Sequence, residues 1–207
     1  RKCIISSKNV IFEGNGYSEE WLEEAKKRGL SNISNVPEAL KEYISEKSKK
    51  LFKDTNILTE RELEARFGIR IETFTKNVQI ETRVLGDLAI NHIIPTAIQY
   101  QNTLIKNVCG IKNLFGEEEM KTISETQLLS IKKISRHISS IRKLVVEMVS
   151  ARKEANKIED VYEKAHSYSI KIIPFLEEIR YHIDKLELIV DDEIWTLPKY
   201  RELLFTR

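Results

Sequence analysis

The stretch IKKISRHISSIRKLVVEM, residues 131 to 148, places its apolar side chains at alternating spacings of three and four. The apolar positions are Ile131, Ile134, Ile138, Ile141, Val145 and Met148. This spacing is the heptad pattern with which one α-helix packs along another. Burying each large side chain of such a seam contributes about 1.5–3 kcal/mol. The stretch therefore predicts a long helix, from about residue 118 to 157, that packs against helical partners.

Two other long stretches carry matching apolar stripes. Residues 59–115 place on one stripe Leu63, Phe67, Ile71, Phe74, Val78, Leu85, Leu88 and His92. Residues 158–190 place on another Val161, Ala165, Tyr168, Ile172, Leu176, Ile179, Ile183, Leu186 and Val190. We expect a bend at Pro95 and at Pro174, because proline cannot donate to the carbonyl four residues earlier and its ring crowds that carbonyl. Three long helices joined by short turns predict an all-α fold, an antiparallel bundle of long helices.

Short helices are expected on both sides of the bundle. Ser18 is expected to cap a helix over residues 19–28 that Gly29 ends. Pro37 suits the first position of a short helix that begins near residue 38. Thr59 and Glu62 have the capping-box spacing that starts the first long helix.

These patterns predict two regions, residues 1–58 as linker and short helices and residues 59–207 as the helical bundle. The tail ends in a short helix that Pro198 is expected to start. The FGEEE stretch at 115–119 is expected to be the turn between the first two long helices.

Composition excludes several classes of function. The 207 residues hold 34 basic and 32 acidic side chains, and the two signs are interspersed. No positive stripe for a phosphate backbone results, so no nucleic-acid partner is expected. The longest apolar stretch, residues 88–98, is interrupted by Asn91, His92 and Pro95 and is too short to span a bilayer, so no membrane partner is expected either.

The cysteines and methionines bear on location and completeness. Cys3 and Cys109 cannot staple a domain of this size, and a reducing cytoplasm is the simple interpretation. Met120 and Met148 are the only methionines, and the sequence begins with arginine. We therefore expect the chain to be part of a longer protein.

The sequence Gly14-Asn15-Gly16 before a helix raises the question of a nucleotide loop. A Walker-type loop would need a lysine and a hydroxyl after its last glycine, and a dinucleotide fingerprint would need a glycine at position 19. Position 19 is glutamate, and Glu19 and Glu20 stand where a phosphate would have to bind. We therefore interpret the glycines as a turn.

Histidine and carboxylate pairs are the candidate metal ligands. Glu163 and His166 have the i, i+3 spacing of di-iron bundles, but no second E-x-x-H occurs in the chain. Glu178 and His182 lie at i, i+4, and residues 191–193 form a short acidic run. For Glu163 and His166 we prefer an exposed ion pair to a metal site.

Two other histidines lie on or beside the apolar stripes. His137 is expected to flank the seam. His92 falls on the stripe one turn from the proline, with Asn91, Asp87 and Glu81 nearby on the same helix. We interpret this group as a buried, hydrogen-bonded polar cluster. We therefore assign no catalytic, no cofactor-binding and no metal-ligating residue.

Four segments carry a resemblance to a known family. They are VIFEGNGYSEEWLEEAKKRGL (10–30), NHIIPTAIQYQN (91–102), ARKEAN (151–156) and DKLELIVDDEIWTLPKYRELLF (184–205). In this order they closely resemble the C-terminal part of type III glutamine synthetases, over essentially the whole chain. The glycine turn then corresponds to the joint between a catalytic region and a helical appendage.

The resemblance implies a parent enzyme that joins ammonia to glutamate, using ATP and Mg²⁺, in a large ring-based homo-oligomer. The family's metal-binding and substrate-binding residues precede the part that this chain resembles, so none is carried over. This implies a structural or oligomerisation domain that packs on the parent's catalytic barrel or on neighbouring subunits and is inactive alone. A free-standing helical interaction module and a metalloprotein built around Glu163 and His166 are the alternatives.

Overall fold

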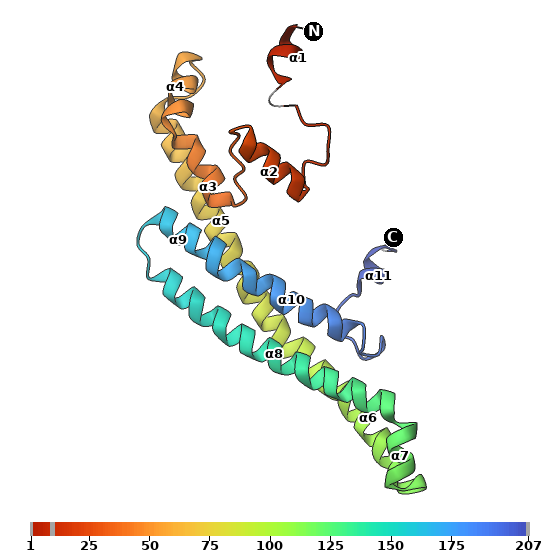
Figure 1. Cartoon of the computed structure of the whole chain (residues 1–207). Helices are drawn as coiled ribbons and strands as arrows, with labels where there is room; N and C mark the ends of the chain where they lie inside the picture. Colours follow the sequence, from red (N-terminus) through yellow and green to blue (C-terminus); the bar gives the residue numbers. More distant parts are fainter. Residues whose placement is uncertain (1, 9–10, 206–207) are drawn as a thin grey trace. The chain divides into compact units, whose positions relative to one another are not determined.

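The structure is a computed structural model that describes residues 2–8 and 11–205. Every regular element in these residues is helical and none is a strand, which confirms the all-α prediction. The chain divides into two compact units, residues 1–67 and 68–207, whose helices are labelled in Figure 1. That residues 1–58 act as a linker region stays a prediction.

The first unit opens with short helices, among them α2 (Glu19–Lys27), which the sequence predicted over residues 19–28. Gly29 follows its end with φ of 69°, a conformation that glycine adopts without strain, and its N–H donates to the carbonyl of Lys26. Ser18 occupies the N-cap position but makes no side-chain cap bond. Its hydroxyl donates to the Asn15 carbonyl at 2.8 Å instead, because the preceding turn brings that acceptor close. The predicted Ser18 cap bond is therefore wrong.

The remaining elements of this unit before residue 60 are α1 (Lys2–Ser6), α3 (Val36–Lys41), the 3₁₀ turn η2 (Glu42–Ile44) and α4 (Glu46–Asp54). Helix α3 starts two residues earlier than predicted, because Asn35 caps it by accepting from the Glu38 N–H at 2.9 Å. Pro37 lies in its first turn, where the missing N–H costs nothing.

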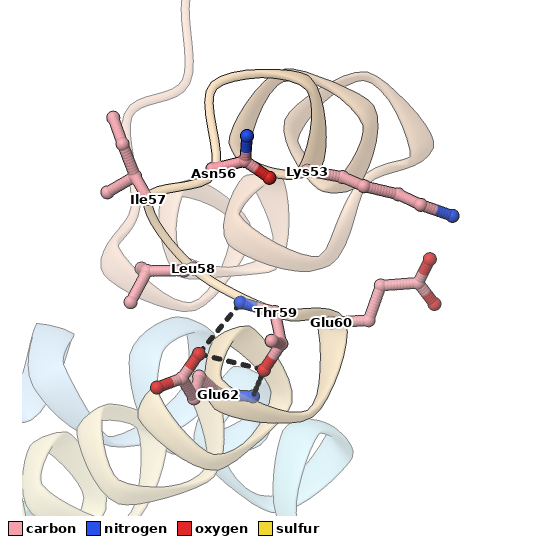
Figure 2. Close-up of a pocket in the computed structure, with 7 residues that line it drawn as sticks. All are labelled: Lys53, Asn56, Ile57, Leu58, Thr59, Glu60 and Glu62. Atoms are coloured by element: carbon pink, nitrogen blue, oxygen red, sulfur yellow. Dashed lines mark hydrogen bonds between the residues drawn. The ribbon is translucent and has the colours of Figure 1, made fainter.

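The capping box predicted at Thr59 and Glu62 is present (Figure 2). The Thr59 N–H donates to Glu62 Oε2 at 2.8 Å, and the Glu62 N–H donates to the Thr59 hydroxyl at 3.3 Å. These bonds start α5 (Glu60–Leu88). The same residues line a shallow hollow of about 320 Å³, together with Lys53 and Asn56.

Each long helix predicted from the sequence is divided in the structure. The first comprises α5, the π-helical turn η3 (Ala89–Ile93) and α6 (Ile94–Phe115). The second, predicted over 118–157, comprises α7 (Glu117–Ile123) and α8 (Glu125–Asn156). The third comprises α9 (Val161–Ser167), the π-helical turn η4 (Tyr168–Ile172) and α10 (Ile173–Glu187). The break at Ser124 was not predicted: this residue has φ of −102° and ψ of 14°, outside the helical range.

Hydrogen bonds between helices define their directions within the second unit. The Gln79 side-chain amide donates to Asn156 Oδ1 at 3.0 Å. The Gln101 side-chain amide donates to the Ile131 carbonyl at 2.9 Å. Residue 79 thus contacts residue 156, and the later residue 101 contacts the earlier residue 131. The continuous helix of α5 and α6 therefore runs antiparallel to α8.

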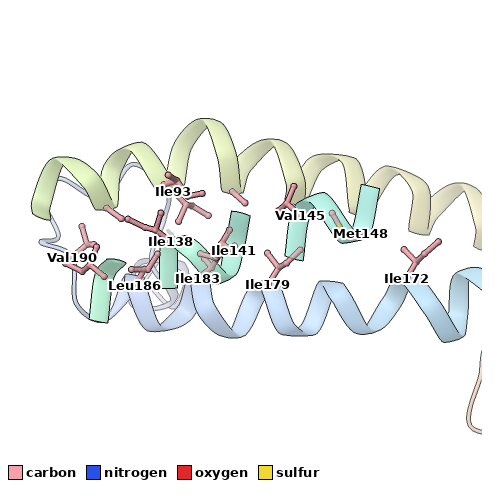
Figure 3. Packing of buried hydrophobic residues seen from close by; sticks show 14 of the residues in the cluster. Ile93, Ile138, Ile141, Val145, Met148, Ile172, Ile179, Ile183, Leu186 and Val190 are labelled. Atoms are coloured by element: carbon pink, nitrogen blue, oxygen red, sulfur yellow. The ribbon is translucent and has the colours of Figure 1, made fainter. Parts of the chain in front are cut away.

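The core of the second unit is the predicted seam (Figure 3). From α8 it includes Ile134, Ile138, Ile141, Val145 and Met148, all buried, while Ile131 is half-buried. From η4 and α10 it includes Tyr168, Ile172, Ile179, Ile183 and Leu186. Only the first position of the third stripe, Val161, is exposed. The buried faces of α8 and α10 were therefore correctly predicted.

The two π turns stand at the same offset from a proline. Turn η3 ends two residues before Pro95, and η4 ends two residues before Pro174. The N–H of Ile94 donates to the carbonyl of Ala89, five residues earlier, as in any π turn. The wider turn relieves the clash between the proline ring and the carbonyl four residues before it. A π turn therefore precedes each proline, and the bend predicted at Pro95 and Pro174 stays a prediction.

The π turn η3 also explains one wrong prediction. His92 is exposed, although the stripe of α5 predicted that it would be buried. A π turn holds one residue more than an α turn, so the buried stripe shifts by one position. It continues at Ile93 and Ala97, which are buried in the core.

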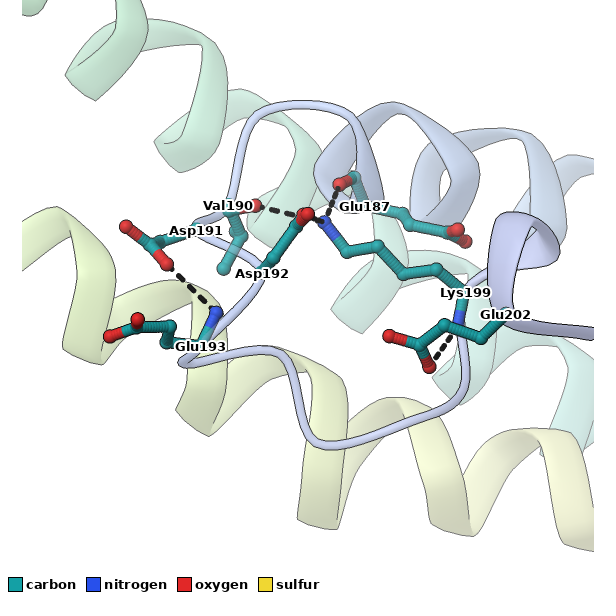
Figure 4. A network of polar contacts seen from close by, with 7 residues as sticks. All are labelled: Glu187, Val190, Asp191, Asp192, Glu193, Lys199 and Glu202. Carbon is teal, nitrogen blue, oxygen red and sulfur yellow. Dashed lines mark hydrogen bonds and ion pairs between the residues drawn. The ribbon is translucent and has the colours of Figure 1, made fainter. Parts of the chain in front are cut away.

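Hydrogen bonds and an ion pair of Lys199 hold the tail against the end of α10 (Figure 4). The Lys199 ammonium donates to the carbonyls of Glu187 and Val190 at 2.9 and 3.2 Å and pairs with Asp192 at 2.5 Å. It thus satisfies carbonyls that the end of a helix leaves free, where positive charge is favourable. Trp195 lies buried in the core from this loop. The final helix, α11 (Tyr200–Leu203), starts two residues after the predicted Pro198.

Candidate functional site

The Gly14-Asn15-Gly16 segment forms a turn, as predicted. The Asn15 side-chain oxygen accepts from the Tyr17 N–H at 3.0 Å, and the Ser18 N–H donates to the Asn15 carbonyl at 3.0 Å. A Cβ atom at Gly14 would lie 2.6 Å from the Phe12 ring, so the backbone here approaches an aromatic side chain. A larger residue at position 14 would clash with the Phe12 ring as it is placed here, which accounts for glycine at this position.

The Glu163 and His166 pair lies on α9. Glu163 is exposed, and its N–H donates to Asp160 at 2.8 Å, which caps the helix. His166 stacks on Tyr162 with ring centroids 6.0 Å apart. Within residues 2–8 and 11–205, no group of three or more His, Cys, Asp or Glu side chains could hold a metal ion.

The polar cluster expected around His92 is not buried. Asn91, Asp87 and Glu81 are exposed, as is His92 itself. The Asn91 amide donates to Asp87 Oδ1 at 2.6 Å, one turn earlier on the helix surface. The prediction of a buried cluster was therefore wrong, because the π turn η3 shifts the buried stripe from His92 to Ile93.

The structure brings together two histidines that the sequence left apart. His137 of α8 and His182 of α10 place their Nδ1 atoms 2.9 Å from each other, with ring centroids 5.2 Å apart. One ring must donate and the other must accept, so at least one of the two is neutral. His182 of α10 thus contacts His137 of α8.

The histidine pair lies in a groove between α8 and α10, a hollow of about 540 Å³. From α8 the groove is lined by Lys133, Arg136, His137 and Ser140, and from α10 by Tyr181, His182, Lys185, Leu188 and Ile189. We call this surface the basic groove. None of its lining residues is acidic. In the part of the chain that the structure describes, Lys133, Arg136 and Lys185 form no ion pair with a carboxylate.

The charge of the groove affects the histidine pair. Burial lowers the pKa of His137, and His182, Lys185 and Lys133 lower it further by repulsion. Lys185 also lies over the Tyr181 ring, 5.3 Å from its centroid. The basic groove therefore gathers basic side chains that form no ion pair with a carboxylate among the described residues. We take it as the candidate functional site.

The basic groove was missed by sequence reasoning, although a signal for it existed. His137 and His182 each stand one residue before a seam isoleucine, Ile138 and Ile183. Two antiparallel helices joined at residues 157–160 bring such flanking positions to the same side of the seam. Pairing the two stripes in this register would have placed the histidines within about one turn of each other.

Comparison with known proteins identifies the class to which the helical chain belongs. Residues 1–112 match the family described as glutamine synthetase C-terminal domain. This match covers more than half of the 207 residues. The chain therefore belongs to the glutamine synthetase C-terminal domain family.

Individual relatives agree with this family over the full chain. A glutamine synthetase of Bacteroides fragilis (strain YCH46) is 52% identical over 207 residues. A type-3 glutamine synthetase of Dictyostelium discoideum is 32% identical over 207 residues, and a glutamine synthetase of Butyrivibrio fibrisolvens is 26% identical over 206. The chain spans 28% of the length of the first two and 29% of the third. The similarity to the type-3 protein supports type III, the type that the resemblance implies.

Among the helices described for residues 2–8 and 11–205, none combines the length and the apolar character needed to cross a bilayer.

Proposed function

We propose that this chain is a structural and oligomerisation domain within a type III glutamine synthetase. Its full-length protein would ligate ammonia to glutamate at the cost of ATP, in the cytoplasm and as a homo-oligomer. Family membership supports the parent reaction. The exposed thiols of Cys3 and Cys109 support a reducing compartment. A free-standing interaction module is the alternative, and the match to only 28% of each of the first two relatives favours the domain of a larger protein.

The observation that carries the structural role is an apolar face on the outside of α5. Ile80 and Val84, one helical turn apart, are 60% and 51% exposed. At 100° per residue they lie about 40° from each other, on the face away from buried Val78. Ile69 is also exposed, but the exposed ion pair of Glu72 and Lys76 separates it from them. Large aliphatic side chains gathered on one helix face are typical of a surface that another protein surface covers. We propose that a neighbouring subunit of the same protein covers it.

The test combines Ile80→Lys and Val84→Lys in the full-length protein. Two charges in a buried apolar interface oppose association, so mass photometry should show a shift from the full assembly to smaller species. Val146→Lys is the matched control, because Val146 is 69% exposed on α8 and away from this face. An unchanged mass distribution for the double variant would refute the proposed role of this face.

We further propose that this segment supplies no group to the ATP or metal site of the parent enzyme. The turn at residues 14–16 does not fit a triphosphate, because no lysine follows it and Glu19 and Glu20 fill the helix start. The expected result is that the purified chain, shown to be helical by circular dichroism, lacks ligase activity. In calorimetry it should also give no saturable heat with Mg²⁺ and ATP up to about 1 mM. A dissociation constant of that size corresponds to a binding free energy of about −4 kcal/mol.

A further inference from the structure

We propose that the basic groove between α8 and α10 docks an acidic segment from the part of its own full-length protein that lies outside these residues. The segment would carry two or more carboxylates and an apolar side chain. This inference rests on the proposed function, since it requires a longer parent protein. It concerns a different surface from the apolar face of α5.

The groove gathers positive charge. Lys133, Arg136 and Lys185 converge on one groove whose other polar groups are histidines and hydroxyls. All three basic side chains are exposed, so water solvates them and their charges remain available to a partner. Like charges gathered in one hollow create a positive potential that attracts an acidic segment.

The histidine pair offers a hydrogen-bond donor to an outside partner. Nδ1 of His137 and Nδ1 of His182 lie 2.9 Å apart, so each ring uses one nitrogen on the other. The ring that accepts at Nδ1 carries its proton on Nε2 and can donate it to an outside acceptor. A metal ion does not fit here, because the surrounding lysines and arginine repel cations. A carboxylate does fit, because it accepts this hydrogen bond and offsets the positive charge.

The apolar lining of the groove suits a protein segment better than a small anion. Leu188 is 81% exposed and Tyr181 is 56% exposed, and both line the groove. Such large apolar side chains beside basic groups suit a peptide that offers both carboxylates and an apolar residue. The lining residues of α8, from 133 to 140, extend over about 10 Å, which is the span of several peptide residues.

The segment would come from the remainder of the same protein. The chain spans 28% of the length of its Bacteroides relative, so most of such a protein lies outside these residues. That outside portion is held at high effective concentration by the covalent connection, which favours it over an unlinked partner. A second copy of this domain is disfavoured, because it would bring the same basic groove.

The test places a photo-reactive benzoylphenylalanine at position 188 of the full-length protein, in place of Leu188. After irradiation and proteolysis, mass spectrometry should find a crosslinked peptide from outside these 207 residues that contains at least two Asp or Glu. Charge reversal with Lys133→Glu and Lys185→Glu together should lower the yield about threefold or more, as should raising salt from about 0.1 to 0.5 M. The same probe at Val146, on another surface of α8, should be insensitive to both changes.

Several results would overturn the inference. These are the absence of a crosslink, a crosslinked peptide without carboxylates, one from a second copy of this domain, and a yield that charge reversal leaves unchanged. Density for a small anion in the groove of the full-length protein would also overturn it. If the double variant fails to fold, Arg136→Gln in the same assay replaces it. Loss of assembly on mutation of α5 with no crosslink at position 188 would refute this inference alone, and the reverse pattern would refute the oligomerisation role alone.

Discussion

The hydroxyl of Tyr168 donates to Oδ1 of Asn156 at 2.7 Å, which joins the π turn η4 to the last residue of α8. The same oxygen accepts from the Gln79 amide at 3.0 Å, so one acceptor connects three helical elements. Tyr168 is fully buried as a residue, and burial raises the pKa of its hydroxyl. The ring therefore contributes by packing and the hydroxyl by a directed bond.

These two contributions can be separated by mutation. Tyr168→Phe should lower the free energy of unfolding by about 0.5–1.5 kcal/mol, the usual net value of one hydrogen bond. Tyr168→Ala should lower it by about 3–5 kcal/mol, because it also leaves a cavity. Urea denaturation measures both. In an Asn156→Ala background the loss from Tyr168→Phe should largely vanish, and a full loss there would mean that the hydroxyl acts through another partner.

The seam of α8 provides a second prediction. Ile138→Asp places a charge in the core and should cost several kcal/mol, typically about 3–5. Lys132→Asp, at an exposed position of the same helix, should cost less than about 1 kcal/mol. Denaturation midpoints of the two variants provide the comparison. Equal losses would show that the helix buries a different face.

The seam could be predicted because its signal is local and periodic. On α8 and α10 the spacing of apolar residues alone determines which face is buried, and the structure has the same faces. The capping box at Thr59 and Glu62 was predictable for the same reason, since its partners lie three residues apart. Patterns of this kind depend only on residues that are close in the sequence, so they can be recognised without knowledge of the tertiary structure.

The errors arise where one local event changes the register. The π turn η3 inserts one residue, so the prediction for His92 was wrong while Ile93 is buried. The His137 and His182 contact was missed because it depends on the alignment of two helices, not on spacing within one. The site therefore required the structure, whereas the fold class did not.

The π turn η3 leads to a third prediction, on helix register. Deleting one residue rotates the following helix by about 100° relative to the preceding part. Deletion of His92, combined with Pro95→Ala, should turn the π turn into α-helix and keep both buried stripes aligned. Its free energy of unfolding should fall by less than about 2 kcal/mol.

The control deletes Glu81 in the same Pro95→Ala background. Glu81 is also exposed but lies in regular α-helix, so its loss should rotate core residues to the surface. That variant should lose cooperative unfolding as followed by circular dichroism. Comparable stability of the two deletions would mean that the π turn does not set the register.

The histidine pair makes a fourth prediction, on pH. The pKa of His137 is lowered below its ordinary 6.5, chiefly by burial, so the folded state favours the neutral ring. Below about pH 6.5 the unfolded chain binds the proton more readily, and the free energy of unfolding should fall as pH falls. Above that pH both states are neutral at this site and the effect disappears.

His137→Asn should therefore reduce the loss of stability between about pH 6.5 and 5, measured as the shift in thermal midpoint. His92→Asn is the control, since His92 is exposed and away from the groove. A pH profile identical to that of the unchanged chain after His137→Asn would show that this ring does not set the acid sensitivity.

The contacts of Lys199 make the last prediction, on the tail. Its side chain is 12% exposed, and its ammonium donates to the carbonyls of Glu187 and Val190 at the end of α10. Lys199→Met keeps the aliphatic stem but removes these charged hydrogen bonds, and it should cost about 1–2 kcal/mol. Asp192→Asn removes the ion pair with a half-exposed carboxylate and leaves the carbonyl contacts of Lys199 in place, which should cost less than about 1 kcal/mol. Hydrogen exchange should then be faster at amides 188–198 in Lys199→Met and unchanged along α8. If both variants behave alike, the ion pair holds the tail and the carbonyl contacts contribute nothing.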